Sequence, residues 1–301
     1  MISAAGSFLR RAAAGAVASL PTQGGVGEAG EICVAVAVRD DVRPTDQPFV
    51  DELLLGMTPV LDAASCRLVQ LYGHTDDAFW TLADYIRKWR LTGMVLVSVH
   101  DGDPLPELLH SAGFPVVSVG RTEIPEIPFA DADNRGGAAD AVMHLVARGR
   151  QRIATITGPL GQHAMTDRLE GYTDALVASG LTFDDALVAH GDGTAVGGRA
   201  AMAELLRSSG GLDAVLVASD IMTAGALETL DGRGLRVPDD VAVVGFDDGD
   251  VARDRGLTVI GQPVDELGAA AADLMLRVIG EGPGQVNPVC LPTHLVVRSS
   301  T

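Results

Sequence analysis

The chain has 301 residues, of which 22 are lysine or arginine and 40 are aspartate or glutamate, so its formal net charge is -18. This acidity argues against a protein that binds nucleic acid over its whole surface, because clustered lysine and arginine carry most phosphate binding. The length suggests about two domains. With 47% hydrophobic and 21% charged residues, the composition is that of a folded protein. No apolar stretch approaches the roughly 18 residues of a membrane span, so we expect no membrane partner.

The first 30 residues are rich in alanine and glycine, and we predict that they form a loosely ordered arm. Within them, Arg10 and Arg11 precede a weakly apolar stretch from Ala12 to Leu20. This order is that of an export signal, but the stretch has little of the hydrophobicity that such a signal needs. We therefore expect a cytoplasmic protein and keep export as the alternative.

Three cysteines, Cys33, Cys66 and Cys290, stand far apart in the sequence and match no zinc-binding or disulfide pattern. Each lies in an apolar run, where cysteine behaves as a small buried hydrophobic residue. We expect all three to be buried and free, as in the reducing cytoplasm.

From residue 31 onward, short β-branched apolar runs alternate with longer segments of helical spacing, which is typical of parallel sheets covered by helices. Each run ends in a polar or glycine-rich turn, so the carboxyl ends of the strands are candidate ligand sites. In chain order, the predicted strands are Ile32 to Val38, Arg67 to Tyr72, Met94 to Val99, Pro115 to Val119, Arg152 to Thr157, Ala186 to His190, Ala214 to Ala218 and Val241 to Phe246.

The last four runs repeat the first four at a distance of about 120 residues, as Met94-Val-Leu-Val97 and Ala214-Val-Leu-Val217 illustrate. This period is too long for a solenoid and predicts an α/β protein of two similar, doubly wound parallel-sheet lobes. We assign residues 31–131 plus 262–282 to the first lobe and residues 132–261 plus 286–301 to the second. Two lobes joined by chain crossings predict a hinged ligand cleft.

Motifs of catalysis and cofactor binding are missing from the sequence. Arg39-Asp40-Asp41 follows the first strand in place of a dinucleotide-binding G-x-G-x-x-G motif, and Gly158-Pro-Leu-Gly161 lacks the lysine of a phosphate-binding loop. The metalloprotease motif H-E-x-x-H, the C-x-x-C pair and the G-x-S-x-G nucleophile elbow are also missing. We therefore expect no cofactor, no metal and no enzymatic activity.

Short polar side chains follow several predicted strands. Carboxylates and hydroxyls that converge in this way suit a polyhydroxylated ligand. Arg168 follows the fifth strand by about ten residues, where a helix can direct its guanidinium group toward the same ligand. Asp220 is equally suited to capping the helix that follows it. These side chains lie at or just beyond strand ends: Asp40 at the first strand, Ser98 at the third, Ser219 and Asp220 at the seventh, and Asp247 at the eighth.

The segment from Ser219 to Asp248, which contains Val237-Pro-Asp-Asp-Val-Ala-Val-Val-Gly-Phe-Asp-Asp248, resembles the C-terminal lobe of LacI/GalR-type transcriptional regulators. So do Arg168-Leu-Glu-Gly-Tyr172 and Gln262-Pro-Val-Asp-Glu-Leu-Gly268. The resemblance covers roughly residues 31–298. It implies a periplasmic-binding-protein-like fold of type I, a sugar or nucleoside-like effector, a homodimer, and effector-dependent control of DNA binding.

The resemblance also implies roles for particular residues. Arg168 and Asp247 would contact effector hydroxyls, and Gln262 would be a contact on the hinge side. Ser219 stands where the family usually has an asparagine. Gly191-Asp-Gly-Thr194 stands where the family commonly offers an aromatic ring, and Phe49, at the position of an aromatic residue of the first lobe, is expected to compensate for that loss.

The family places a helix-turn-helix and a hinge helix before the first strand, whereas only about 30 residues precede it here. We therefore expect no direct DNA binding by this chain and link it to DNA through family kinship alone. The alternative function is that of a secreted sugar-binding protein of a transporter, which shares the fold and loses its first 20 to 30 residues on export.

Overall fold

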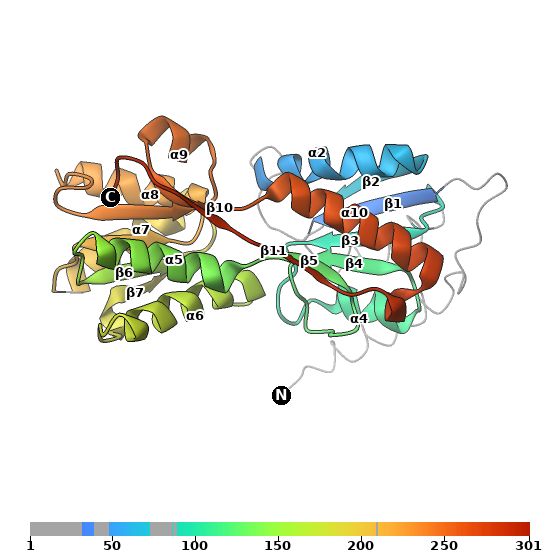
Figure 1. The fold of residues 1–301 in the computed structure, drawn as a ribbon, viewed down its shortest axis with the longest axis horizontal. Coiled ribbons are helices and arrows are strands. Elements are labelled where there is room, and N and C mark those ends of the chain that lie inside the picture. The colour runs from blue at the N-terminus through green and yellow to red at the C-terminus, as the bar shows by residue number, and fades with distance from the viewer. Residues whose placement is uncertain (1–31, 39–47, 73–85, 87–88, 209) are drawn as a thin grey trace. The chain divides into compact units, whose positions relative to one another are not determined.

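The computed structural model describes residues 32–38, 48–72, 86, 89–208 and 210–301. The chain divides into two compact units. The first comprises the residues up to Asp131 together with Val264–Cys290, and the second comprises Ala132–Pro263 together with Leu291–Thr301. Each unit contains a six-stranded sheet flanked by helices (Figure 1).

The sheet of the first unit has the strand order β11-β5-β4-β3-β1-β2. The pairs β2–β1, β1–β3, β3–β4 and β4–β5 are all parallel. One face of this sheet packs on α4, and α10 packs against α2 and the sheet. The elements are β1 (Ile32–Val38), α2 (Pro48–Ala63), β2 (Cys66–Tyr72), β3 (Gly93–Val97), α4 (Pro104–Ser111), β4 (Val116–Val119), β5 (Phe129–Ala132), α10 (Val264–Glu281), a 3₁₀ turn (Pro283–Gln285) and β11 (Val289–Leu291).

The sheet of the second unit has the order β12-β10-β9-β8-β6-β7, in which only the edge strand β12 is antiparallel to its neighbour. The elements are α5 (Asn134–Ala147), β6 (Ile153–Thr157), α6 (His163–Ala178), a 3₁₀ turn (Asp185–Leu187), β7 (Val188–His190), α7 (Ala195–Ser208), β8 (Ala214–Val217), α8 (Asp220–Gly232), β9 (Ala242–Phe246), α9 (Asp250–Arg255), β10 (Thr258–Gly261) and β12 (His294–Val296).

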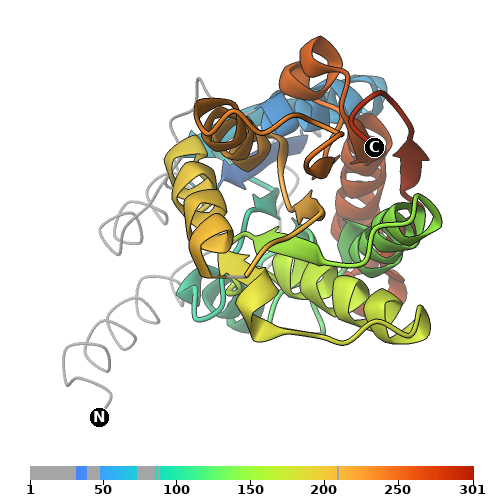
Figure 2. The same ribbon diagram turned by 90° about the vertical axis from the view of Figure 1, so that its left-hand side faces the viewer.

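Side chains that alternate between the two faces of β8 show how helices cover both faces of the second sheet. Val215 and Val217 of β8 belong to a core shared with α7, α8 and α9, whereas Ala214 and Leu216 belong to a core shared with α5 and α6. Successive side chains of a strand point to opposite faces, so a strand buried on both faces is apolar at every position. Figure 2 shows the two helix pairs on opposite sides of this sheet, α5 and α6 in green and α7 and α8 in yellow to brown.

Glycines allow α7 and α8 to approach closely. A Cβ atom on Gly225 would lie 1.8 Å from the carbonyl oxygen of Ala195, and one on Gly198 would lie 2.2 Å from that of Met222. The two helices therefore pack backbone against backbone, which holds the start of α8 firmly beside the carboxyl end of β8.

We expect Gly225→Ala to lower the free energy of unfolding by about 2–3 kcal/mol, because the added methyl group forces the helices apart. Gly232→Ala is the matched control, since a Cβ there meets nothing within 4 Å and the same helix gains propensity worth up to about 1 kcal/mol. Denaturant unfolding measures both. Equal free energies of unfolding for the two variants would contradict the close packing of α7 on α8.

Several elements differ from the sequence prediction. The predicted strand from Ala186 to His190 is shorter, because Asp184 accepts the N–H of Ala186 at 3.0 Å and winds Asp185–Leu187 into a 3₁₀ turn. The strands β5, β10, β11 and β12 were not predicted. These strands have three or four residues each, too few for a clear periodicity.

The chain crossings also differ in detail from the predicted lobes. Residues 286–290, expected in the second lobe, belong to the first unit, because β11 lies beside β5 in its sheet. Gln262, expected in the first lobe, belongs to the second unit. Cys33 and Cys66 are buried, but the prediction for Cys290 was wrong, since it is exposed on the edge strand β11.

Candidate functional site

The carboxyl edge of the second sheet gathers most of the predicted ligand residues. Ser219 and Asp220 follow β8, Asp247 follows β9, and Gln262 follows β10. These strands are neighbours and parallel, so their carboxyl ends lie at one edge of the sheet. Arg168 reaches the same edge from α6 and donates to the carbonyl oxygen of Ala218 at 2.5 Å.

Arg168 is held on several sides. Its side chain is buried, its Nε donates to Oδ1 of Asn134 at 2.8 Å, and its guanidinium carbon lies 3.6 Å from the ring centroid of Phe246. The aromatic face attracts the cation, and the two acceptors fix the plane of the guanidinium group. The arginine is therefore positioned before any ligand arrives.

Asn134 and Phe246 contact Arg168 and were not predicted from the sequence. Asn134 begins α5, is buried, and donates from Nδ2 to the carbonyl oxygen of Ala132 at 3.1 Å. Its amide thus has a fixed orientation, with the oxygen directed to Arg168. The position of Asn134 between a strand and a helix is a signal for a ligand or capping role, but the sequence does not show its contact with Arg168, 34 residues away.

Asp247 has an unusual backbone conformation. Its φ angle is +76°, in the left-handed region, and its N–H donates to the carbonyl oxygen of Ile260 at 2.9 Å. The Gln262 side chain donates from Nε2 to Oδ1 of Asp247 at 2.5 Å. Aspartate is one of the few residues apart from glycine that tolerates this region, and such strain is commonly found at binding sites. Asp247 and Gln262 therefore form a hydrogen-bonded pair at the carboxyl edge of the sheet.

Ser219 and Asp220 cap two different helices. Ser219 is the N-cap of α8 and accepts the N–H of Met222 at 3.3 Å. The carboxylate of Asp220 instead lies beside Gly249 at the start of α9. Burial, followed by the nearby charge of Asp247, raises its pKa to about 6, while the backbone N–H groups of Val251 and Ala252 act to lower it. The sequence analysis expected Asp220 to cap α8, the helix that follows it, whereas its carboxylate lies at the start of α9.

The segment after β7 carries no aromatic ring. Asp192 accepts the N–H of Thr194 at 2.9 Å and its hydroxyl at 2.6 Å, and these bonds lower the pKa of Asp192. Thr194 in turn accepts the N–H of Gly197 at 3.0 Å. This segment therefore forms a compact turn that starts α7.

The remaining predicted residues belong to the first unit. Asp40 lies outside the described residues. Phe49 is half-buried in the first turn of α2. Ser98 directly follows β3 with a φ angle of +59° and is also half-buried. The structure thus places Ser98 at the carboxyl end of a central strand.

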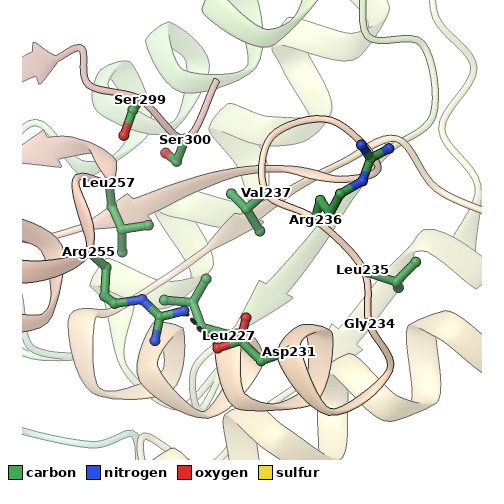
Figure 3. Close-up of a pocket in the computed structure, with 10 residues that line it drawn as sticks. All are labelled: Leu227, Asp231, Gly234, Leu235, Arg236, Val237, Arg255, Leu257, Ser299 and Ser300. Carbon is green, nitrogen blue, oxygen red and sulfur yellow. Dashed lines mark hydrogen bonds and ion pairs between the residues drawn. The ribbon is translucent and has the colours of Figure 1, made fainter.

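A separate hollow of about 450 Å³ lies at the other end of the second unit (Figure 3). It lies between the end of α8 and the segments that lead into β9 and β10, so it faces away from Asp247. Its charged side chains are paired, Arg255 with Asp231 at 2.7 Å and Arg236 with Asp240 at 2.9 Å. Its lining comprises Leu227, Asp231, Gly234, Leu235, Arg236, Val237, Arg255, Leu257, Ser299 and Ser300.

Comparison with known proteins identifies the family. Residues 142–301 match the family of periplasmic binding protein-like domains. The HTH-type transcriptional regulator CelR of Thermobifida fusca is 40% identical over 260 residues, which cover 84% of this chain and 76% of that regulator. The chain belongs to the LacI family of transcriptional regulators. The predicted kinship and the predicted fold of two parallel-sheet α/β lobes are thus confirmed.

Two solved structures of LacI-family regulators support the same conclusion. A CelR–cellobiose complex matches with a TM-score of 0.82 and 38% identity, covering 89% of this chain and 84% of that one. A LacI family regulator from Mycobacterium smegmatis matches with a TM-score of 0.79 and 26% identity, covering 89% and 98%. The relatives are regulators, so the alternative of a secreted transport protein is not supported.

Within the described ranges, no helix is both long and apolar enough to cross a membrane. The same residues hold no group of three or more histidine, cysteine, aspartate or glutamate side chains arranged for a metal ion.

Proposed function

We propose that this LacI-family chain is the effector-binding core of a cytoplasmic regulator that senses a small β-linked sugar such as cellobiose. The observation that carries the proposal is the buried arginine at the carboxyl edge of the second sheet, beside the Asp247–Gln262 pair. An arginine fork donates to sugar hydroxyl oxygens, and a carboxylate accepts from their hydrogens. The identity to CelR, whose complex with cellobiose is solved, supports this ligand class.

The proposed ligand contacts are the residues predicted from the sequence. Arg168, Asp247 and Gln262 hold the ligand hydroxyls, with Ser219 beside them and Asp220 behind them. From the first unit, we propose Phe49 as an apolar surface for a sugar ring, Ser98 as a hydroxyl partner, and Asp40 as a further acceptor. None of these groups breaks a bond in the ligand, so the site binds its ligand without transforming it.

The ligand acts by shifting a conformational equilibrium. In this proposal a homodimer exchanges between two states, and the sugar binds one of them more tightly. Control of transcription then follows from the free energy that couples sugar binding to the DNA-binding state, typically 1–3 kcal/mol in allosteric proteins.

Calorimetric titration of the purified chain tests this proposal. The panel contains cellobiose, cellotriose, maltose, glucose, ribose and uridine. We expect saturable binding of cellobiose with a Kd in the micromolar range, near -8 kcal/mol, and weaker binding of the monosaccharides and uridine. Tight binding of uridine with no response to any sugar would replace the sugar with a nucleoside, and no binding of any compound would contradict the proposal.

A further inference from the structure

The helix α9 begins without a side-chain cap from its own N-terminal residue. Its N-cap is Gly249, and the helix spans only Asp250–Arg255. The first N–H groups of a helix have no partner within it and need one from outside. The carboxylate of Asp220, which stands at the start of α8, lies at this turn, where the backbone N–H groups of Val251 and Ala252 lower its pKa. A side chain of one helix therefore faces the open first turn of another.

Packing around Gly249 shows that this contact is tight. A Cβ atom added to Gly249 would lie 2.2 Å from Oδ2 of Asp220. The backbone of Gly249 has φ -78° and ψ -175°, which any residue can adopt, so the atoms that a larger residue would meet here are those of the Asp220 side chain. The other oxygen of Asp220, Oδ1, is buried and has no hydrogen-bond partner among the described residues.

The first turn of α9 lies only a few residues after Asp247, the carboxylate proposed to bind ligand hydroxyls. Asp247 and Asp248 form the connection from β9 to Gly249, and Asp247 holds its left-handed conformation at the strand end. The connection has two anchors on its other side, the Asp247 N–H bonded to Ile260 and the Asp248 carboxylate bonded to Arg298 at 2.9 Å. Asp220 provides the anchor at the α9 end.

We propose that Asp220 is a positioning residue of the effector site: by capping α9 from α8, it fixes the β9–α9 connection and so holds Asp247 ready for ligand hydroxyls. The inference rests on the proposed function and revises one part of it, since Asp220 then acts through Asp247 and makes no ligand contact. The connection also ties the two helices that follow neighbouring strands of the second sheet into one unit.

The charge of Asp220 is part of this role. The carboxylates of Asp247 and Asp250 face it, while Asp248 is paired with Arg298. Burial, followed by the charge of Asp247, raises the pKa of Asp220 from 3.8 to about 6. A neutral carboxyl group accepts N–H bonds less strongly than a carboxylate. Ligand affinity should therefore fall as the pH drops through about 6.

The test measures cellobiose affinity between pH 5 and pH 8 in three variants and the wild type. We expect the wild-type affinity to fall about fivefold toward pH 5, and Asp220→Asn to show the low-pH affinity at every pH. Gly249→Ala should displace the carboxylate and lower affinity about tenfold at pH 7.5. Asp254→Asn, with the same charge change at an exposed side chain of the same helix, should keep the wild-type profile. A wild-type profile in Asp220→Asn would overturn the proposal.

Amide hydrogen exchange decides the inference even if cellobiose is not the ligand. In Asp220→Ala and Gly249→Ala, the amides of Val251 and Ala252 should exchange at least tenfold faster than in the wild type. Unchanged exchange would show that Asp220 does not hold α9. Loss of affinity with unchanged exchange would make Asp220 a direct ligand contact, which also overturns the positioning role. Absence of cellobiose binding by the wild type would refute only the proposed ligand.

Discussion

Replacing Arg168 with alanine is expected to lower cellobiose affinity at least a hundredfold and the free energy of unfolding by about 2–4 kcal/mol. The loss leaves Oδ1 of the buried Asn134 and the carbonyl oxygen of Ala218 without the donor that they share. Each unsatisfied buried acceptor costs about 1–3 kcal/mol, and the contact with the Phe246 ring is lost as well. Binding falls because the ligand loses a bidentate donor that the protein had already oriented.

Denaturant unfolding and calorimetry of the same preparations measure the two effects. Arg199→Ala is the control, since Arg199 is about half exposed and paired with Glu228 at the surface, where such a pair contributes less than about 1 kcal/mol. Arg168→Lys should recover part of the stability but little of the affinity, because an ammonium group lacks the planar fork. Wild-type cellobiose affinity in Arg168→Ala would remove this residue from the site.

Asp247→Asn is expected to lower affinity about 10- to 100-fold with almost no change in stability. Asparagine tolerates a positive φ angle as aspartate does, and its Oδ1 can still accept from Gln262. What it loses is the charge, and hydrogen bonds to charged groups contribute about 1.5–3 kcal/mol, compared with about 1 kcal/mol for neutral ones. The variant thus separates ligand binding from folding.

Calorimetry and thermal unfolding check this separation. The control is Asp240→Asn, which removes a carboxylate that Arg236 hydrogen-bonds at 2.9 Å, a pairing that lowers the pKa of Asp240 to about 2. It lies in the loop before β9, at the far end of the strand from Asp247, and should leave affinity unchanged. A loss of stability in Asp247→Asn as large as its loss of affinity would mean that Asp247 holds the fold and not the ligand.

Local patterns were sufficient for much of the architecture. Continuous apolar runs such as Ala214–Val217 predicted strands buried on both faces, and the repeat of about 120 residues predicted two similar lobes. The antiparallel edge strand β12 was not predicted, because it has only three residues and is held by pairing with β10, more than 30 residues earlier in the chain. Short strands depend on their neighbours more than on their own sequence.

In the candidate site, too, contacts between residues far apart in the sequence could not be predicted. Asp247 could be named because it follows a strand, Arg168 because a helix after a strand can direct it to the same edge of the sheet, and the family resemblance implied a role for both. Asn134, which orients Arg168, was missed because the contact joins residues 34 positions apart. The helix that Asp220 caps was misassigned for a similar reason: Ser219 already caps α8, which leaves the carboxylate for α9. Partners across a fold are set by packing, which one sequence does not display.

Hydrogen exchange with and without cellobiose tests the location of the effector site most directly. We expect protection at the carboxyl edge of the second sheet, in peptides that contain Arg168, Ser219 and Asp247, and no change in the 234–237 and 299–300 segments that line the separate hollow. Protection confined to those two segments, with none around Arg168 and Asp247, would place the ligand at the opposite end of the unit and refute the proposed effector site.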